Sequence, residues 1–97
     1  NKAFAPLDEI ACMLGFPGKM GMSGAHVFEA YQAGEIQKIR DYCETDVLNT
    51  YCVYLKFELM RGNYSESEYV TRLEQLREML AAEGKPHLTG FLEAMQD

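Results

Sequence analysis

Two residues of the sequence, Tyr42 and Asp46, have types and a spacing that suit metal-assisted chemistry. They are four positions apart, so a helix would place both side chains on one face about one turn apart, with Asn49 one further turn along. A carboxylate is a hard oxygen ligand for Mg²⁺ or Mn²⁺, and a phenol one turn away can hydrogen-bond a water beside the metal. In a chain with six tyrosines, the Tyr-x-x-x-Asp spacing arises by chance in roughly one chain in four at average residue usage. The spacing alone therefore favours a solvated helix face.

Motifs for most other enzyme chemistries are absent from the sequence. It contains no phosphate-binding glycine-rich motif, no His-Glu-x-x-His metal motif and no nucleophile elbow. His26 and His87 lie far apart with no ligand spacing around either, so we interpret both as ordinary surface or interface histidines. Tyr42 and Asp46 remain the one constellation with a chemical interpretation.

The composition is that of one small acidic globular domain. The chain has 97 residues, of which 47% are hydrophobic and 25% are charged, and its formal net charge is −6. These values exclude a disordered tail or a collagen-like fibre. The halves 1–48 and 49–97 each carry a net charge of −3 and neither forms a basic stripe. We therefore do not expect the chain to bind a nucleic-acid backbone unassisted.

Glycine and proline divide the chain into five segments of helical periodicity, and strand-like alternation is absent. The expected helices cover 7–14, Ser23 to Gly34, 35–61, the Ser65–Glu68 capping box to Gly84, and 88–95. We favour one long helix over 35–61 rather than two helices with a bend. Its apolar residues, from Ile36 to Leu59, cover more than one face, which indicates a partner layer. The sequence therefore predicts an all-α isolated chain.

Membrane and export signals are also absent. No apolar stretch approaches the length of a bilayer span, and the first residues lack the features of a signal peptide. The start, which has no initiator Met, suggests a cut made inside a longer protein. Cys12, Cys43 and Cys52 are odd in number and show no Cys-x-x-Cys spacing, so we expect reduced thiols in a cytoplasmic chain without a membrane partner.

Four segments of the chain carry a family resemblance. They are 7–11 (LDEIA), 15–19 (GFPGK), 31–34 (YQAG) and 39–51 (IRDYCETDVLNTY). Together they resemble the C-terminal part of the predicted bacterial 3′–5′ exonucleases related to the proofreading domain of family B DNA polymerases, a branch of the DEDDy, ribonuclease H-like exonucleases. The resemblance covers residues 7–62, and Tyr42 and Asp46 match the Tyr-x-x-x-Asp of the third exonuclease motif.

The resemblance implies a reaction and a role for each matching residue. Asp46 would hold one of two Mg²⁺ or Mn²⁺ ions, and Tyr42 would orient the water that attacks the terminal phosphodiester, releasing a nucleoside monophosphate. The implied substrate is the 3′ end of single-stranded DNA. Lys19, in the glycine-rich loop, is the expected phosphate contact, and the alternative for this residue is a solvated loop lysine.

The sequence departs from the family pattern in the first and second motifs. It contains no Asp-x-Glu, so only one of four metal-binding carboxylates is present. We therefore expect the helical C-terminal part of a ribonuclease H-like α/β exonuclease fold, inactive alone, whose sheet lies upstream of Asn1. In this hypothesis residues 1–62 form the C-terminal part of the exonuclease domain and residues 63–97 form a helical C-terminal extension. The long helix would then expose an apolar face that the missing sheet normally covers, which favours self-association of the fragment. The alternative is a non-catalytic helical protein-interaction module.

Overall fold

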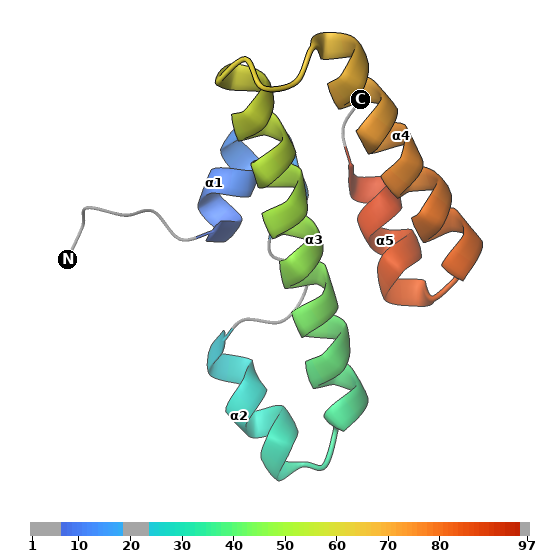
Figure 1. The fold of residues 1–97 in the computed structure, drawn as a ribbon. Coiled ribbons are helices and arrows are strands. Elements are labelled where there is room, and N and C mark those ends of the chain that lie inside the picture. Colours follow the sequence, from blue (N-terminus) through green and yellow to red (C-terminus); the bar gives the residue numbers. More distant parts are fainter. Residues whose placement is uncertain (1–6, 19–23, 96–97) are drawn as a thin grey trace, which may run out of the picture.

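Five helices make up the part of the chain that the computed structural model describes, residues 7–18 and 24–95 (Figure 1). They are α1 (Leu7–Met13), α2 (Gly24–Gln32), α3 (Ile36–Met60), α4 (Glu66–Glu83) and α5 (Pro86–Ala94). No strand occurs among these residues, so the predicted all-α fold of the isolated chain is confirmed. The expected cap of the second helix, Ser23, lies outside the described residues.

The helix ends follow from short-range signals in the sequence. α3 is 25 residues long and contains neither Gly nor Pro. It is followed by Gly62, whose φ of 82° lies in the left-handed region that glycine adopts without steric cost. α4 begins with a capping box: the Glu68 N–H donates to the Ser65 hydroxyl at 3.1 Å, and the Ser65 N–H donates to the Glu68 carboxylate at 2.9 Å. The single long helix and the capping box are therefore both confirmed.

α3 is the spine of the fold, and the other helices are arranged around it (Figure 1). α1 and α2 pack along one side of it, and α4 and α5 pack against each other and against α3 on the other side. One hydrophobic core joins α1, α3, α4 and α5. Its largest fully buried side chains are Cys52, Leu55, Leu80 and Phe91. Residues of the two predicted segments, 1–62 and 63–97, thus contribute to the same core.

Helix apolarity and the state of the cysteines complete the description of the fold. None of the described helices is both long enough and apolar enough to cross a membrane. The three cysteines are free, with Cys12 and Cys43 exposed and Cys52 buried. Burial raises the pKa of the Cys52 thiol to about 11, which keeps it protonated and unreactive at neutral pH.

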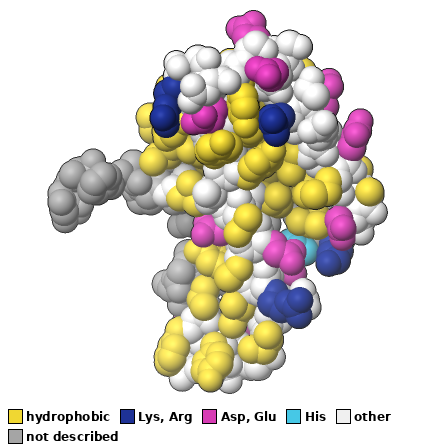
Figure 2. Space-filling view, in the orientation of Figure 1, with side chains coloured by type: hydrophobic (Ala, Val, Ile, Leu, Met, Phe, Trp, Pro, Cys, Tyr) yellow, Lys and Arg dark blue, Asp and Glu magenta, His cyan; other side chains and the backbone are white. Residues whose placement is uncertain are grey.

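A second apolar surface of the long helix faces solvent. The core-facing side of α3 is formed by residues such as Leu48, Cys52 and Leu55. On the opposite side Val47 is 65% exposed and Tyr54 is 49% exposed. Figure 2 shows further exposed apolar side chains over α2 and along α3. We give the name α2–α3 apolar face to six exposed apolar residues of these two helices, which are Phe28, Tyr31, Ile36, Val47, Tyr51 and Tyr54. Large exposed apolar surfaces mark interaction sites.

We expect residues 1–97 alone to self-associate through the α2–α3 apolar face, because association removes this surface from water. Sedimentation velocity at increasing protein concentration measures the association. The Val47→Glu variant places a charge on this face at an exposed position and should shift the chain toward monomer while its helical circular dichroism is retained. A wild-type chain that stays monomeric at all concentrations would contradict this expectation.

Candidate active site

The predicted catalytic pair, Tyr42 and Asp46, lies one turn apart in the first half of α3. Tyr42 is half-buried and Asp46 is exposed. The backbone carbonyls of both residues accept hydrogen bonds from hydroxyl groups of the same helix. The Thr45 hydroxyl donates to the Tyr42 carbonyl and the Thr50 hydroxyl donates to the Asp46 carbonyl, each at 2.9 Å. The helical spacing that the Tyr-x-x-x-Asp argument requires is therefore present.

The Asp46 side chain is exposed to solvent. Among the described residues its carboxylate has no hydrogen-bond or ion-pair partner, and it does not belong to the group of three ligand-capable side chains described below. A carboxylate in this state can give an oxygen ligand to Mg²⁺ or Mn²⁺ without first breaking an ion pair. It cannot by itself hold two ions, because a two-metal site needs several converging carboxylates. Asp46 thus fits the role of one metal ligand and not that of a complete site.

Asn49, one turn beyond Asp46, anchors the glycine-rich loop beside the candidate site. Its side-chain carbonyl accepts a hydrogen bond from the Gly18 N–H at 2.9 Å, and its amide donates to the Gly18 carbonyl at 2.7 Å. The same amide donates to the Thr45 carbonyl at 3.2 Å. Asn49 is only 3% exposed, so these hydrogen bonds are shielded from water. The loop after α1 is therefore fixed to α3 three residues from Asp46.

We expect the Asn49→Leu variant to lower the free energy of unfolding by about 2–4 kcal/mol, because it leaves the buried N–H and C=O of Gly18 without partners. Urea unfolding followed by circular dichroism measures the change. Asn63→Leu is the matched control, since Asn63 is exposed and its amide donates to the Glu58 carboxylate at 2.8 Å in a hydrogen bond that water can replace. If Asn49→Leu lowers the free energy of unfolding no more than Asn63→Leu does, the hydrogen bonds between Asn49 and Gly18 contribute nothing to stability.

A second polar cluster joins α5 to α3. The His87 Nε2 lies 2.6 Å from a Glu44 oxygen, and its Nδ1 lies 3.4 Å from an Asp41 oxygen. Asp41, Glu44 and His87 each offer one atom that could bind a metal ion, and these three atoms lie within 4.8 Å of one another. Each ring nitrogen faces a different carboxylate, and the contact of Nε2 with Glu44 is a hydrogen bond. We therefore interpret the cluster as a contact that holds α5 against α3.

The His87 cluster is not part of the Asp46 site. Glu44 and Asp46 are two residues apart, which places their side chains about 160° apart around a helix of 3.6 residues per turn. They cannot share one metal ion. The sequence predicts a surface or interface position for His87. Its two acidic partners lie more than forty residues earlier in the chain, so no local spacing indicates the contact.

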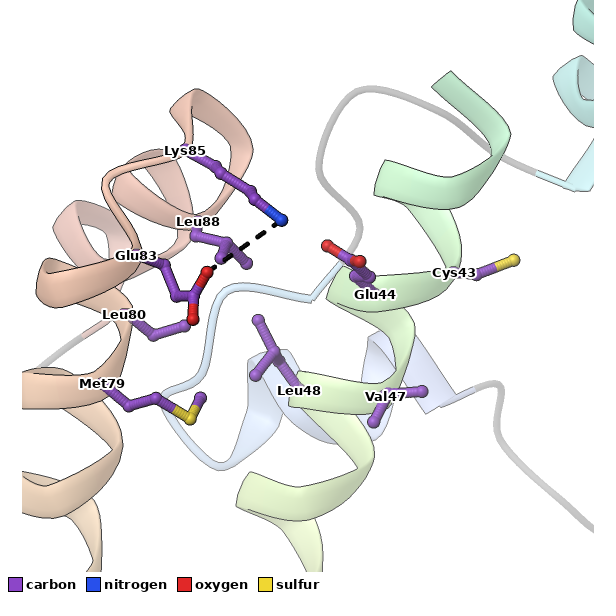
Figure 3. A pocket seen from close by; sticks show the side chains of 9 residues that line it. All are labelled: Cys43, Glu44, Val47, Leu48, Met79, Leu80, Glu83, Lys85 and Leu88. Carbon is purple, nitrogen blue, oxygen red and sulfur yellow. Dashed lines mark ion pairs between the residues drawn. The ribbon is translucent and has the colours of Figure 1, made fainter. Parts of the chain in front are cut away.

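A groove on the same side as the His87 cluster lies between α3 and the α4–α5 pair (Figure 3). Its volume is about 440 Å³, and its lining is mostly apolar, with Val47, Leu48 and Leu80 among the side chains that enclose it. Lys85 and Glu83 form an ion pair of 4.0 Å at the groove (Figure 3). Neither Tyr42 nor Asp46 lines it, so the groove is separate from the candidate active site.

The predicted phosphate contact, Lys19, lies outside the described residues, and its role stays a prediction. It directly follows Gly18 in the sequence, the residue that Asn49 binds through both backbone groups. The sequence singled out Asn49 only by its position one turn after Asp46. Its partner Gly18 is 31 residues away along the chain, which is why sequence periodicity could not predict the contact.

Comparison with known proteins identifies the family. A family model described as a predicted 3′–5′ exonuclease related to the exonuclease domain of PolB matches residues 1–95. No curated protein and no solved structure matches the chain. The match confirms the resemblance found over residues 7–62 and extends through α4 and α5. The chain therefore belongs to the family of predicted 3′–5′ exonucleases related to the exonuclease domain of PolB.

Proposed function

We propose that this chain supplies the third motif of a Mg²⁺- or Mn²⁺-dependent 3′–5′ exonuclease of the DEDDy type that acts on the 3′ ends of single-stranded DNA. The observation that carries the proposal is an intact Tyr-x-x-x-Asp pair on a regular helix inside the family match. Asp46 is the metal ligand and Tyr42 the residue that positions the attacking water. The exposed, unpartnered carboxylate of Asp46 supports the first role.

Each residue of the pair has one task in the proposed reaction. When bound, divalent ions offset the charge that develops on the phosphate and lower the pKa of the attacking water. Asp46 would hold one of these ions through its carboxylate. The Tyr42 hydroxyl hydrogen-bonds the water so that its oxygen lies in line with the phosphorus–O3′ bond. A bond forms from the water oxygen to phosphorus as the P–O3′ bond breaks, the O3′ of the shortened strand takes up a proton, and a nucleoside 5′-monophosphate leaves.

The proposal needs carboxylates beyond Asp46, because two-metal catalysis uses several that converge on ions roughly 4 Å apart. The one group of three ligand-capable side chains found among the described residues excludes Asp46 and faces another side of α3. We propose that the other ligands, and the sheet that carries them, lie in chain outside residues 1–97. The α2–α3 apolar face is the surface that we propose packs against that sheet, as a half-buried helix layer covers a sheet.

Residues 1–97 alone are expected neither to hydrolyse DNA nor to bind Mg²⁺ tightly, since a single carboxylate cannot offset the dehydration of Mg²⁺. The test uses a labelled single-stranded oligonucleotide with Mg²⁺ or Mn²⁺, and calorimetric titration of Mg²⁺ into the chain. The complete enzyme that carries this chain should shorten the same oligonucleotide. An Asp46→Ala chain excludes a contaminating nuclease. Turnover by residues 1–97 that disappears in this variant would mean that they contain a complete site, which contradicts the proposal.

A non-catalytic helical interaction module is the second candidate function. The exposed α2–α3 apolar face favours it, because a module of this kind needs a docking surface. The coding sequence upstream of Asn1 separates the two. An Asp-x-Glu within a strand pattern favours the nuclease, and an immediate start codon favours the module. For either function we propose the cytoplasm, where free thiols such as Cys12 and Cys43 persist.

A further inference from the structure

The His87 cluster brings one imidazole and two carboxylates together from two helices. Asp41 and Glu44 are three residues apart in the first half of α3, so they lie on the same side of the helix. His87 lies in the first turn of α5. The three side chains are between 15% and 45% exposed, so an ion can reach them from solvent while they are partly shielded from water.

The hydrogen bond between His87 and Glu44 indicates which ring nitrogen is available to an ion. Nε2 of His87 lies 2.6 Å from a Glu44 oxygen. A carboxylate can only accept hydrogen bonds, so we assign the hydrogen atom of this bond to Nε2. In the neutral imidazole Nδ1 then carries a lone pair and no hydrogen atom. A metal-binding histidine needs this state, in which one ring nitrogen donates to a carboxylate and the other holds the metal.

Nδ1 of His87 faces Asp41 at a distance that suits a bridging ion. The Asp41 oxygen lies 3.4 Å from Nδ1, beyond the range of about 2.7–3.2 Å for N–H···O hydrogen bonds. Two atoms bound to one tetrahedral Zn²⁺ ion at about 2.0–2.2 Å lie roughly 3.3–3.6 Å apart. The separation of Nδ1 and the Asp41 oxygen therefore equals that of two ligands of one ion. A cation between these atoms also offsets the repulsion between their lone pairs.

Each of the two facing groups is oriented by a second side chain. Glu44 holds the His87 ring through Nε2. The Gln37 amide donates at 2.8 Å to the same Asp41 oxygen that faces Nδ1, and this oxygen retains a second lone pair for an ion. Outer partners that orient the ligands are typical of metal sites in proteins. The cluster thus has two inner groups, on His87 and Asp41, and two outer ones, on Glu44 and Gln37.

We propose that the His87 cluster binds one Zn²⁺ ion through Nδ1 of His87 and the Asp41 carboxylate, with water in the remaining positions. Imidazole nitrogen and carboxylate oxygen are both Zn²⁺ ligands, whereas Mg²⁺ prefers oxygen ligands and keeps its waters. The ion joins the start of α5 to α3. It is separate from the ions of the proposed exonuclease, because Asp46 does not belong to the cluster.

Calorimetric titration of Zn²⁺ into residues 1–97 tests the site. The parent protein for this test carries Cys12→Ser and Cys43→Ser, so that the two exposed thiols cannot supply the binding. We expect one Zn²⁺ ion per chain that excess Mg²⁺ does not displace. Because the ion binds the folded chain, the melting temperature should rise, by roughly 10 °C at a free Zn²⁺ concentration about 100-fold above the dissociation constant.

Three substitutions in the parent protein separate the inner groups from the outer one. His87→Ala and Asp41→Asn each remove an inner ligand and should abolish the rise in melting temperature with Zn²⁺. Glu44→Ala removes only the partner of Nε2 and should weaken Zn²⁺ binding by about 10- to 100-fold. Circular dichroism without Zn²⁺ shows whether each variant folds. If His87→Ala does not fold, Asp41→Asn decides, since asparagine keeps the shape of the side chain.

His26→Ala is the matched control, because His26 is exposed on α2 and lies outside the cluster. It should bind Zn²⁺ as the parent protein does. A parent protein that binds no Zn²⁺ overturns the inference. Zn²⁺ binding that His87→Ala and Asp41→Asn leave unchanged overturns it as well, because the ion then binds elsewhere. Equal affinities of Glu44→Ala and the parent protein contradict the assignment of Glu44 as the outer partner.

Discussion

The Asp46→Ala variant of the complete enzyme is expected to lose exonuclease activity by roughly 10³-fold or more while it keeps its fold. The loss follows because a metal ligand secures several kcal/mol of transition-state stabilisation, and about 1.4 kcal/mol corresponds to a tenfold change in rate. The fold is kept because the Asp46 side chain is exposed and alanine is a good helix former. Initial rates on single-stranded DNA with Mg²⁺ measure the first effect, and thermal unfolding measures the second.

Asp41→Ala is the matched control for this prediction. Asp41 carries the same charge on the same helix, but its carboxylate faces Nδ1 of His87 at 3.4 Å. The control should retain activity and lose some stability, because it weakens the contact between α3 and α5. An inactive Asp41→Ala enzyme beside an active Asp46→Ala enzyme would move the metal site to the His87 cluster.

The Tyr42→Phe variant should reduce kcat by about 10- to 100-fold, less than Asp46→Ala. The hydroxyl orients the attacking water, and a misplaced reactant costs about 10²-fold, but the water retains the metal that activates it. The Mg²⁺ concentration that gives half-maximal activity should therefore stay the same. Steady-state kinetics at several Mg²⁺ concentrations measure both quantities.

Tyr54→Phe provides the comparison for Tyr42→Phe. Tyr54 lies on the same helix and belongs to the α2–α3 apolar face, so loss of its hydroxyl should leave kcat unchanged. Equal effects of the two substitutions would show a general effect on α3. In that case Tyr42 would have no special role in positioning the water.

The helices of this chain could be predicted because their signals are local. Gly62 and Gly84 adopt positive φ at the ends of α3 and α4, and Ser65 with Glu68 forms the cap of α4. Each signal involves residues a few positions apart, where spacing in sequence fixes spacing on a helix. The Tyr42–Asp46 geometry could be predicted for the same reason, since it needs only that residues four apart share a helix face.

Contacts between helices could not be predicted from these local patterns. The Asn49 side chain is bound to Gly18 across 31 residues, and His87 meets Glu44 across 43 residues. Asn and His occur on helices in many exposed positions, so neither residue type indicates a distant partner. Periodicity identified the apolar residues of α3 but not which side the core would use. The structure buries Leu48 and Leu55 and leaves Val47 exposed.

The direction and product of hydrolysis by the complete enzyme test the central claim most directly. A single-stranded oligonucleotide labelled at its 5′ end is incubated with Mg²⁺, and the products are resolved nucleotide by nucleotide. The account predicts labelled strands that shorten progressively from the 3′ end, release of nucleoside 5′-monophosphates, and no product with EDTA or with Asp46→Ala. Immediate release of a labelled mononucleotide, or an unchanged product series in the Asp46→Ala enzyme, would contradict it.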